Sequence, residues 1–182
     1  AYKVYTTSEP FKISATATGD GTGFSYTSNN PSVATVSSTG VVTVHKLGRA
    51  VITVTTIGNK KSDPVSDEVY VKVHPRKTTI SKKPWNDGKA AVRVRWNKQD
   101  DVTKYQIKYS RDKSFKSGTY KVKTVEDLGL NYTTQSTKLS GLKKGARYYI
   151  KVRAIKEVYN ENGTKLTYYG TWSNWRSVVV KK

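Results

Sequence analysis

Apolar and polar residues alternate at every second position along most of this chain, and this period of two limits its fold more than any other feature. Between residues 91 and 96, for example, Val92, Val94 and Trp96 alternate with two arginines. Successive side chains of a β-strand point to opposite faces, so the pattern predicts strands that bury one face. No long segment carries apolar residues at helical spacing between helix caps. We therefore expect an all-β fold.

Turn-forming residues separate the expected strands. In the first half, short β-branched runs alternate with clusters of Gly, Asn, Asp and Ser, which is typical of antiparallel sandwiches. In the second half, aromatic and aliphatic residues alternate with Lys or Arg, so we expect aromatic side chains inside and cations outside. The expected strands include 41–44, 51–55, 69–73, 105–109, 120–124, 148–154 and 177–181.

Charge divides the chain into two parts. Its 182 residues include 33 Lys or Arg and 13 Asp or Glu, for a net charge of +20. Residues 1–78 hold nine basic and five acidic residues, whereas residues 79–182 hold 24 and eight. The change coincides with a polar stretch around Pro75, and proline cannot donate to a strand ladder. We therefore expect one domain over 1–75, a short linker, and a second domain over 76–182.

Several spaced elements in the first half agree with one family. Residues 30–36 read Asn-Pro-Ser-Val-Ala-Thr-Val, Gly40 leads a hairpin, and residues 48–54 read Gly-Arg-Ala-Val-Ile-Thr-Val. In this order they resemble the bacterial immunoglobulin-like group 2 domain over about residues 2–75. The resemblance implies an immunoglobulin-like sandwich, and a turn at Gly40 fits a positive φ.

The second half resembles a fibronectin type III domain over residues 77–182. Trp96 ends a strand where that family keeps its core tryptophan, and residues 142–148 read Leu-Lys-Lys-Gly-Ala-Arg-Tyr, similar to the family's tyrosine corner. Lys144 replaces the usual proline, which softens the turn. The resemblance implies a core ring for Tyr148 with its hydroxyl bonded to backbone upstream. Together the two resemblances imply two consecutive immunoglobulin-like antiparallel β-sandwiches joined by a short linker, an architecture that hosts many unrelated roles.

Few residues offer catalytic or metal-binding chemistry. The chain has no cysteine, which excludes disulfides, thiolate metal sites and cysteine nucleophiles. His45 follows a strand and His74 lies in the linker, so a packing or solvated role outweighs catalysis for both. Adjacent acids at 100–101 and 126–127 form no ready carboxylate pair, and two carboxylates fall short of the about six to eight oxygens that calcium needs. We expect no enzyme activity, no cofactor and no metal.

One surface of the second domain is a candidate binding site. If its third, fourth, sixth and seventh strands form one sheet, as the resemblance implies, a set of cations and one tyrosine share the solvent face. Like charges on neighbouring strands repel, so folding alone does not favour this arrangement. A polyanion such as wall teichoic acid, a sulfated glycan or nucleic acid would bind such a face by counterion release. Solubility and protection of edge strands by lysine form the alternative interpretation, which we favour. The set is Lys104, Lys108, Lys121, Lys123, Tyr149, Lys151 and Arg153.

A tryptophan motif lies near the end of the chain. Residues 172–176 read Trp-Ser-Asn-Trp-Arg, which looks like a degenerate form of the Trp-Ser-x-Trp-Ser box of cytokine receptor domains. The resemblance implies rings stacked with arginines, here Trp172 with Arg153 and Arg147 of the preceding strand. We favour this structural ladder over stacking of Trp172 on a sugar ring, because Arg and Trp on adjacent strands satisfy each other locally.

These observations predict a non-catalytic pair of cell-surface or secreted modules that space or present other domains and support adhesion. The candidate partners are an anionic cell-wall polymer, a glycan or a host surface protein. Two alternatives stay open. One is polyanion or cell-wall carbohydrate binding through the basic face, and the other is an accessory role in a larger secreted glycan- or peptidoglycan-active enzyme. Nucleic acid is disfavoured, since the cations spread along strands without a recognised motif.

The expected location is outside the cell. The lysine-rich second domain is similar to versions in secreted, wall-associated proteins of Gram-positive bacteria. No run of about 18 apolar residues occurs, so we expect no membrane insertion, and we favour a monomer. The chain begins with Ala1 and shows no signal segment, which predicts a mature piece or an excised fragment.

Overall fold

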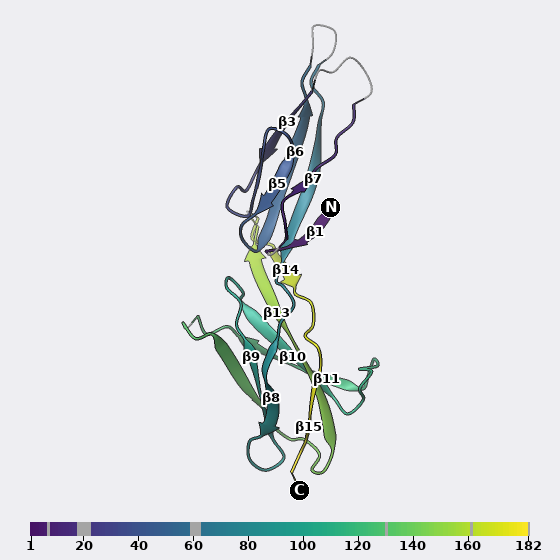
Figure 1. Ribbon diagram of the computed structural model, residues 1–182, viewed down its shortest axis with the longest axis vertical. Coiled ribbons are helices and arrows are strands. Elements are labelled where there is room, and N and C mark those ends of the chain that lie inside the picture. Colours follow the sequence, from purple (N-terminus) through teal and green to yellow (C-terminus); the bar gives the residue numbers. More distant parts are fainter. Residues whose placement is uncertain (7, 18–22, 59–62, 130, 161, 182) are drawn as a thin grey trace. The chain divides into compact units, whose positions relative to one another are not determined.

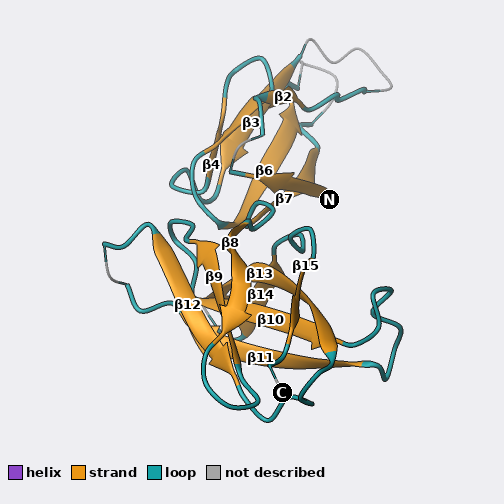
Figure 2. Ribbon diagram, turned by 60° about the horizontal axis from the view of Figure 1, so that its bottom comes forward, coloured by secondary structure: helices purple, strands orange, loops and turns teal. Residues whose placement is uncertain are grey.

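The computed structural model describes residues 1–182 except 7, 18–22, 59–62, 130, 161 and 182. The described residues form fifteen strands and no helix, which confirms the all-β expectation (Figure 1; Figure 2). The chain divides into two compact units, Ala1–His74 and Pro75–Lys182, and each unit has buried apolar side chains of its own.

The first unit contains a four-stranded sheet in the order β1-β7-β6-β3 and a three-stranded sheet in the order β2-β5-β4. Within its described residues the ladders are antiparallel except for β1 and β7, in which Val4 pairs with Val73 in parallel register. This parallel pair departs from the purely antiparallel sandwich that the sequence predicts. The strands are β1 (Tyr2–Tyr5), β2 (Phe11–Lys12), β3 (Phe24–Ser28), β4 (Ala34–Val36), β5 (Val41–Val44), β6 (Gly48–Thr56) and β7 (Ser66–His74).

Alternation along the strands builds the core of the first unit. Ile52 of β6, Val73 of β7 and Val42 of β5 are fully buried, and each such side chain stabilises the fold by about 1.5–3 kcal/mol. Gly40 turns the chain between β4 and β5 with φ at 80°. A Cβ at this position would lie 2.9 Å from the ring of Tyr26, so both the backbone and the packing require glycine.

The second unit contains a larger sheet in the order β11-β10-β13-β14, with β15 also paired to β13, and a three-stranded sheet in the order β12-β9-β8. Strand β13 forms antiparallel ladders with β10, β14 and β15, so it is the central strand of the larger sheet. The strands are β8 (Ile80–Asn86), β9 (Val92–Asn97), β10 (Lys104–Ser110), β11 (Tyr120–Glu126), β12 (Thr134–Leu139), β13 (Arg147–Tyr159), β14 (Lys165–Tyr169) and β15 (Arg176–Val179).

Two aromatic rings meet in the core of the second unit. Trp96 of β9 and Tyr105 of β10 are both 0% exposed, and their ring centroids lie 5.3 Å apart. Ile107 of β10 and Ile150 of β13 are also fully buried. The core position expected for Trp96 is confirmed.

A tyrosine corner precedes β13. The backbone N–H of Lys143 donates a hydrogen bond of 3.1 Å to the hydroxyl of Tyr148, as the family resemblance implies. The ring of Tyr148 is half-buried and lies 6.4 Å from that of Tyr109, centroid to centroid. The corner therefore fixes the entry of the chain into the central strand of the larger sheet.

Candidate functional site

The register between β10 and β13 decides which side chains share the outer face of the larger sheet. Paired residues on neighbouring strands point to the same face, and Tyr105 and Ile107 between them point into the core. Five of the predicted residues lie on this outer face, namely Lys104, Lys108, Tyr149, Lys151 and Arg153. The pairs are Lys108 with Lys151, Gln106 with Arg153, and Ser110 with Tyr149.

Lys121 and Lys123 lie on the opposite face of this sheet, so their assignment to the outer face is wrong. Lys123 pairs with Ile107 and Lys121 pairs with Tyr109, and both partners face the inner side. The Nζ atom of Lys123 reaches across to donate 2.8 Å to the carbonyl of Lys138 in the other sheet. Because β11 is an edge strand, its inner side is only partly covered and accommodates inward-pointing lysines.

Trp172 lies between two cations of the outer face. Its ring centroid is 4.5 Å from the guanidinium carbon of Arg153 and 4.8 Å from Nζ of Lys108. Arg153 also lies 4.1 Å from the ring of Tyr169, and Lys108 lies 4.0 Å from the ring of Tyr120. The expected stacking of Arg153 on Trp172 is thus confirmed. We call these five residues the cation–π ladder.

Backbone pairing holds Trp172 in the ladder, although residues 170–175 are not a regular strand. The N–H of Ser173 donates 2.8 Å to the carbonyl of Val152. The buried hydroxyl of Ser173 accepts a bond of 3.0 Å from the N–H of Val152. The segment therefore continues the pairing with β13 and places the preceding tryptophan over the outer face.

Arg153 is held in a fixed orientation. Its Nε and Nη2 atoms donate to Oε1 of Gln106 at 2.9 and 2.7 Å. Burial lowers the pKa of Arg153, but arginine keeps its charge in proteins. Arg147, which the sequence predicts beside Trp172, instead donates to the hydroxyl of Ser177 at 3.3 Å. The second cation of the ladder is therefore Lys108 rather than Arg147.

Further aromatic contacts cover the remaining cations on this side. Nζ of Lys151 lies 4.6 Å from the ring centroid of Phe115, and Nζ of Lys113 lies 5.2 Å from that of Trp175. The ring of Trp175 packs edge-on against Tyr149 with centroids 5.2 Å apart. Sequence reasoning missed Phe115 and Lys113, because their loop reaches this face only through the β10–β11 hairpin.

Carboxylates compensate the cation at the start of β10. Nζ of Lys104 lies 2.9 Å from Glu157 and 3.4 Å from Glu126, and Glu157 lies 3.3 Å from Lys165. The hydrogen bond between Lys104 and Glu157 raises the pKa of the lysine and lowers the pKa of the glutamate. Each of the four predicted cations that do lie on the outer face, Lys104, Lys108, Lys151 and Arg153, therefore has an aromatic or acidic partner in the same unit.

We expect Arg153→Gln to lower the free energy of unfolding of the second unit by about 1–2 kcal/mol, through loss of two ring contacts and the bonds to Gln106. Urea unfolding followed by tryptophan fluorescence measures this loss, because all four tryptophans, at positions 85, 96, 172 and 175, belong to the second unit. The matched control is Arg147→Gln, which removes the same charge from the same strand and is expected to change stability by less than about 0.5 kcal/mol. Equal losses in both variants would contradict the ladder.

The histidines and paired acids of the sequence occupy ordinary structural positions. His74 is the last residue of β7, paired with Tyr5, so its expected place in a linker is wrong. Nε2 of His45 hydrogen-bonds to the hydroxyl of Thr35 at 2.9 Å, and Asp101 forms an ion pair with Lys156. Among the residues that the structure describes, no group of three or more His, Cys, Asp or Glu could hold a metal ion. The same residues include no helix with the length and hydropathy of a membrane span.

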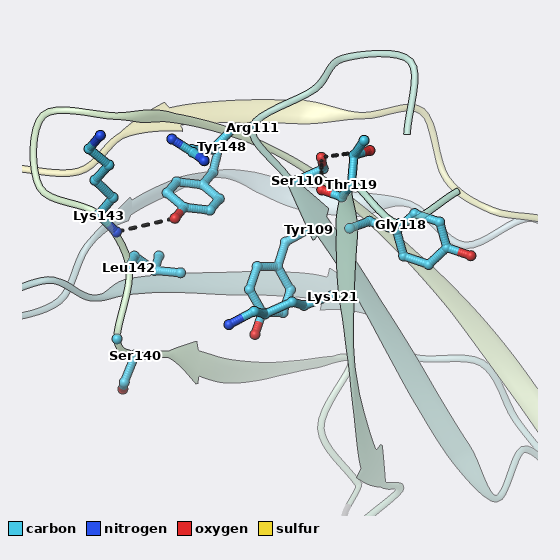
Figure 3. Close-up of a pocket in the computed structure, with 12 residues that line it drawn as sticks. Tyr109, Ser110, Arg111, Gly118, Thr119, Lys121, Ser140, Leu142, Lys143 and Tyr148 are labelled. Atoms are coloured by element: carbon cyan, nitrogen blue, oxygen red, sulfur yellow. Dashed lines mark hydrogen bonds between the residues drawn. The ribbon is translucent and has the colours of Figure 1, made fainter. Parts of the chain in front are cut away.

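A cleft of about 430 Å³ lies beside the tyrosine corner (Figure 3). Buried Ser110 and Leu142 contribute to its lining, together with the half-buried rings of Tyr109 and Tyr148. The sequence does not predict this cleft, because the β10–β11 hairpin and the turn before β13, which are separate in the chain, form it together. The lining consists of residues 109–111, 118–121 and 140–143, with Tyr148.

Family comparisons agree with the order of the two domains that the sequence predicts. The model of the intimin immunoglobulin-like domain matches residues 5–57, and that of the fibronectin type III domain matches residues 75–168. The expected order, an immunoglobulin-like domain followed by a fibronectin type III domain, is confirmed. Domains of both kinds are generally non-catalytic and are typical of extracellular proteins. No curated protein matches the chain.

Solved structures similar to the chain were also found. A myokine structure is 18% identical over 59% of this chain and 99% of that chain, with a TM-score of 0.37. The chicken CNTN1 FN1–FN3 domains are 21% identical over 88% and 57%, with a TM-score of 0.45. The chicken interferon gamma receptor alpha chain is 10% identical over 92% and 89%, with a TM-score of 0.43. Through residues 75–168, more than half of its length, the chain belongs to the fibronectin type III family.

Proposed function

We propose that the chain is a non-catalytic pair of modules that spaces and presents other parts of an extracellular bacterial surface protein. One observation carries this proposal: aromatic rings and carboxylates of the same unit compensate the positive charges on the outer face of the second unit. Lys108 and Arg153 stack on rings, and Lys104 pairs with carboxylates. Such contacts stabilise a sheet and do not require a ligand.

Separate cores support the same role. Each unit buries its own apolar side chains, including Ile52 in the first and Trp96 in the second. A module with its own core folds without help from a ligand or a metal, and it is therefore suited to repeated use as a spacer. We place the protein outside the cell, secreted or attached to the wall of a Gram-positive bacterium. Adhesion through an anionic wall polymer, a glycan or a host surface protein would add to this role.

A display experiment tests the spacer role. The chain is inserted, in one copy or two tandem copies, between a wall anchor and a peptide tag on a Gram-positive bacterium. We expect antibody binding to the tag to rise from the bare anchor to one copy, and again with two copies. Antibody binding no greater than on the bare anchor would contradict the proposal.

A further inference from the structure

The corrected register places Lys121 on the wall of the cleft beside the tyrosine corner. Lys121 pairs with Tyr109 in the β10–β11 ladder, and both residues line the cleft. Arg111 lines it from the end of β10, and Lys143 lines it from the turn before β13. Three cations therefore line one cleft of about 430 Å³, a volume within the range of small-molecule sites.

These three cations differ from those of the outer face. Within the described part of the chain, the side chains of Arg111, Lys121 and Lys143 form no ion pair and no cation–π contact. All three are exposed and line the same cleft, so their like charges repel one another. A bound anion would relieve that repulsion.

The nearest carboxylate in sequence does not supply this counter-charge. Asp112 follows Arg111, but its side chain accepts hydrogen bonds from the backbone and hydroxyl of Ser114, at 2.8 Å each. It also accepts from the N–H of Lys116 and from the hydroxyl of Thr119, both at 3.3 Å. The bonds from Ser114 lower the pKa of Asp112, and Asp112 is not among the cleft residues. Among the residues that the structure describes, no Asp or Glu lines the cleft.

Aromatic and hydroxyl groups complete the cleft. Figure 3 shows the rings of Tyr109 and Tyr148 in the midst of the lining residues. The hydroxyl of Tyr148 accepts its bond from Lys143, so its own hydrogen is available to a ligand. The phenol of Tyr109 is neutral at physiological pH and burial raises its pKa further, so its hydroxyl can donate. Ser140 adds an exposed hydroxyl at the rim.

We propose that this cleft binds a sugar that carries a phosphate or sulfate ester. Arg111, Lys121 and Lys143 contact the oxyanion through charge-assisted hydrogen bonds, which are stronger than neutral ones. The tyrosine rings contact the apolar face of the sugar, and the hydroxyl groups bond to its oxygens. The spacer role does not depend on this site, so either proposal can fail alone.

Isothermal titration calorimetry of the intact chain at physiological salt tests the proposal. The probes are glucose 6-phosphate, glucose 6-sulfate and, as the neutral control, glucose. The test variant is Arg111→Gln with Lys121→Gln, and the matched control is Lys116→Gln with Lys144→Gln. Both double variants remove two exposed charges from the same region, but Lys116 and Lys144 do not line the cleft. Circular dichroism checks that each variant is folded.

We expect both esters to bind the unmodified chain and glucose to bind at least tenfold more weakly. The test variant should bind the esters at least tenfold more weakly, whereas the control variant should stay within twofold of the unmodified chain. The ester that binds more tightly indicates the source of the natural ligand. Tighter binding of the phosphate indicates a wall polymer, and tighter binding of the sulfate indicates a sulfated glycan. Absence of ester binding at millimolar concentration, or an equal loss in both double variants, would overturn the proposal.

Discussion

Replacing Trp96 with alanine is expected to lower the free energy of unfolding of the second unit by about 3–5 kcal/mol, the largest single effect that we predict. Trp96 is fully buried, and its ring packs 5.3 Å from that of Tyr105. Alanine would remove this contact and leave a cavity between the two sheets. Such a loss is a large fraction of the stability of an ordinary domain.

Two further variants separate cavity formation from other causes. Trp96→Phe keeps an aromatic ring at this site and removes an indole N–H that has no hydrogen-bond partner among the described residues, so we expect a loss of only about 1–2 kcal/mol. Trp175→Ala removes a tryptophan that is 38% exposed and should cost about 1 kcal/mol. Urea unfolding, followed by the fluorescence of the remaining tryptophans, measures the loss of stability in all three variants. Comparable losses for Trp96→Ala and Trp175→Ala would contradict the core assignment.

Hydrogen exchange on the same Trp96→Ala sample tests whether the two units are stable separately. Peptides from β6 in the first unit, which include Ile52, should keep their protection while peptides from β9 and β10 lose it. The physical reason is that Ile52 is buried by its own unit. Loss of protection in β6 as well would show that the first unit depends on the second.

The sequence was sufficient for the fold where a local pattern and a buried face coincide. Val92, Val94 and Trp96 alternate with arginines, and all three are fully buried in β9. The tyrosine corner is also local, because Lys143 and Tyr148 are five residues apart. Both features depend on short stretches of chain, so a residue pattern is enough to predict them.

The orientation of an edge strand could not be predicted in the same way. Alternation separates the two faces of β11 but does not say which one meets the core. The sequence placed Tyr120 inside and the lysines outside. In the structure Tyr120 packs on Lys108 of the outer face, while Lys121 faces the cleft. The pairing of Lys121 with Tyr109 across the β10–β11 hairpin decides this, and no local pattern records it.

The candidate sites also contain some features that a local pattern predicts and others that depend on distant segments. Trp172 was found because its motif is local, and its contact with Arg153 followed from adjacent strands. Its other partner, Lys108, comes from a strand more than fifty residues earlier. The cleft depends on three segments at once, so the three cations that line it could not be grouped from the sequence.

Raising the pH from 10 to 12 is expected to remove about 2 kcal/mol of stability from the second unit through Tyr105 alone. Burial raises the pKa of Tyr105 to about 12, from an ordinary value of 10.0. Between these values the unfolded chain releases the phenol proton while the folded chain keeps it. The unfolded state then binds fewer protons, so the free energy of unfolding falls as the pH rises.

Comparison with Tyr105→Phe isolates this contribution from the other tyrosines and the lysines that titrate in the same range. Near pH 8 the variant should be less stable by about 1–3 kcal/mol, because the buried N–H of Gln99 loses the hydroxyl to which it donates at 2.8 Å. Phenylalanine has no proton to lose, so the difference should shrink steadily above pH 10 and vanish or reverse by pH 12. Urea midpoints across this range measure the difference. A difference that stays constant would show that Tyr105 ionises in the folded chain as readily as in the unfolded one, and the core around Trp96 and Tyr105 would then be open to water.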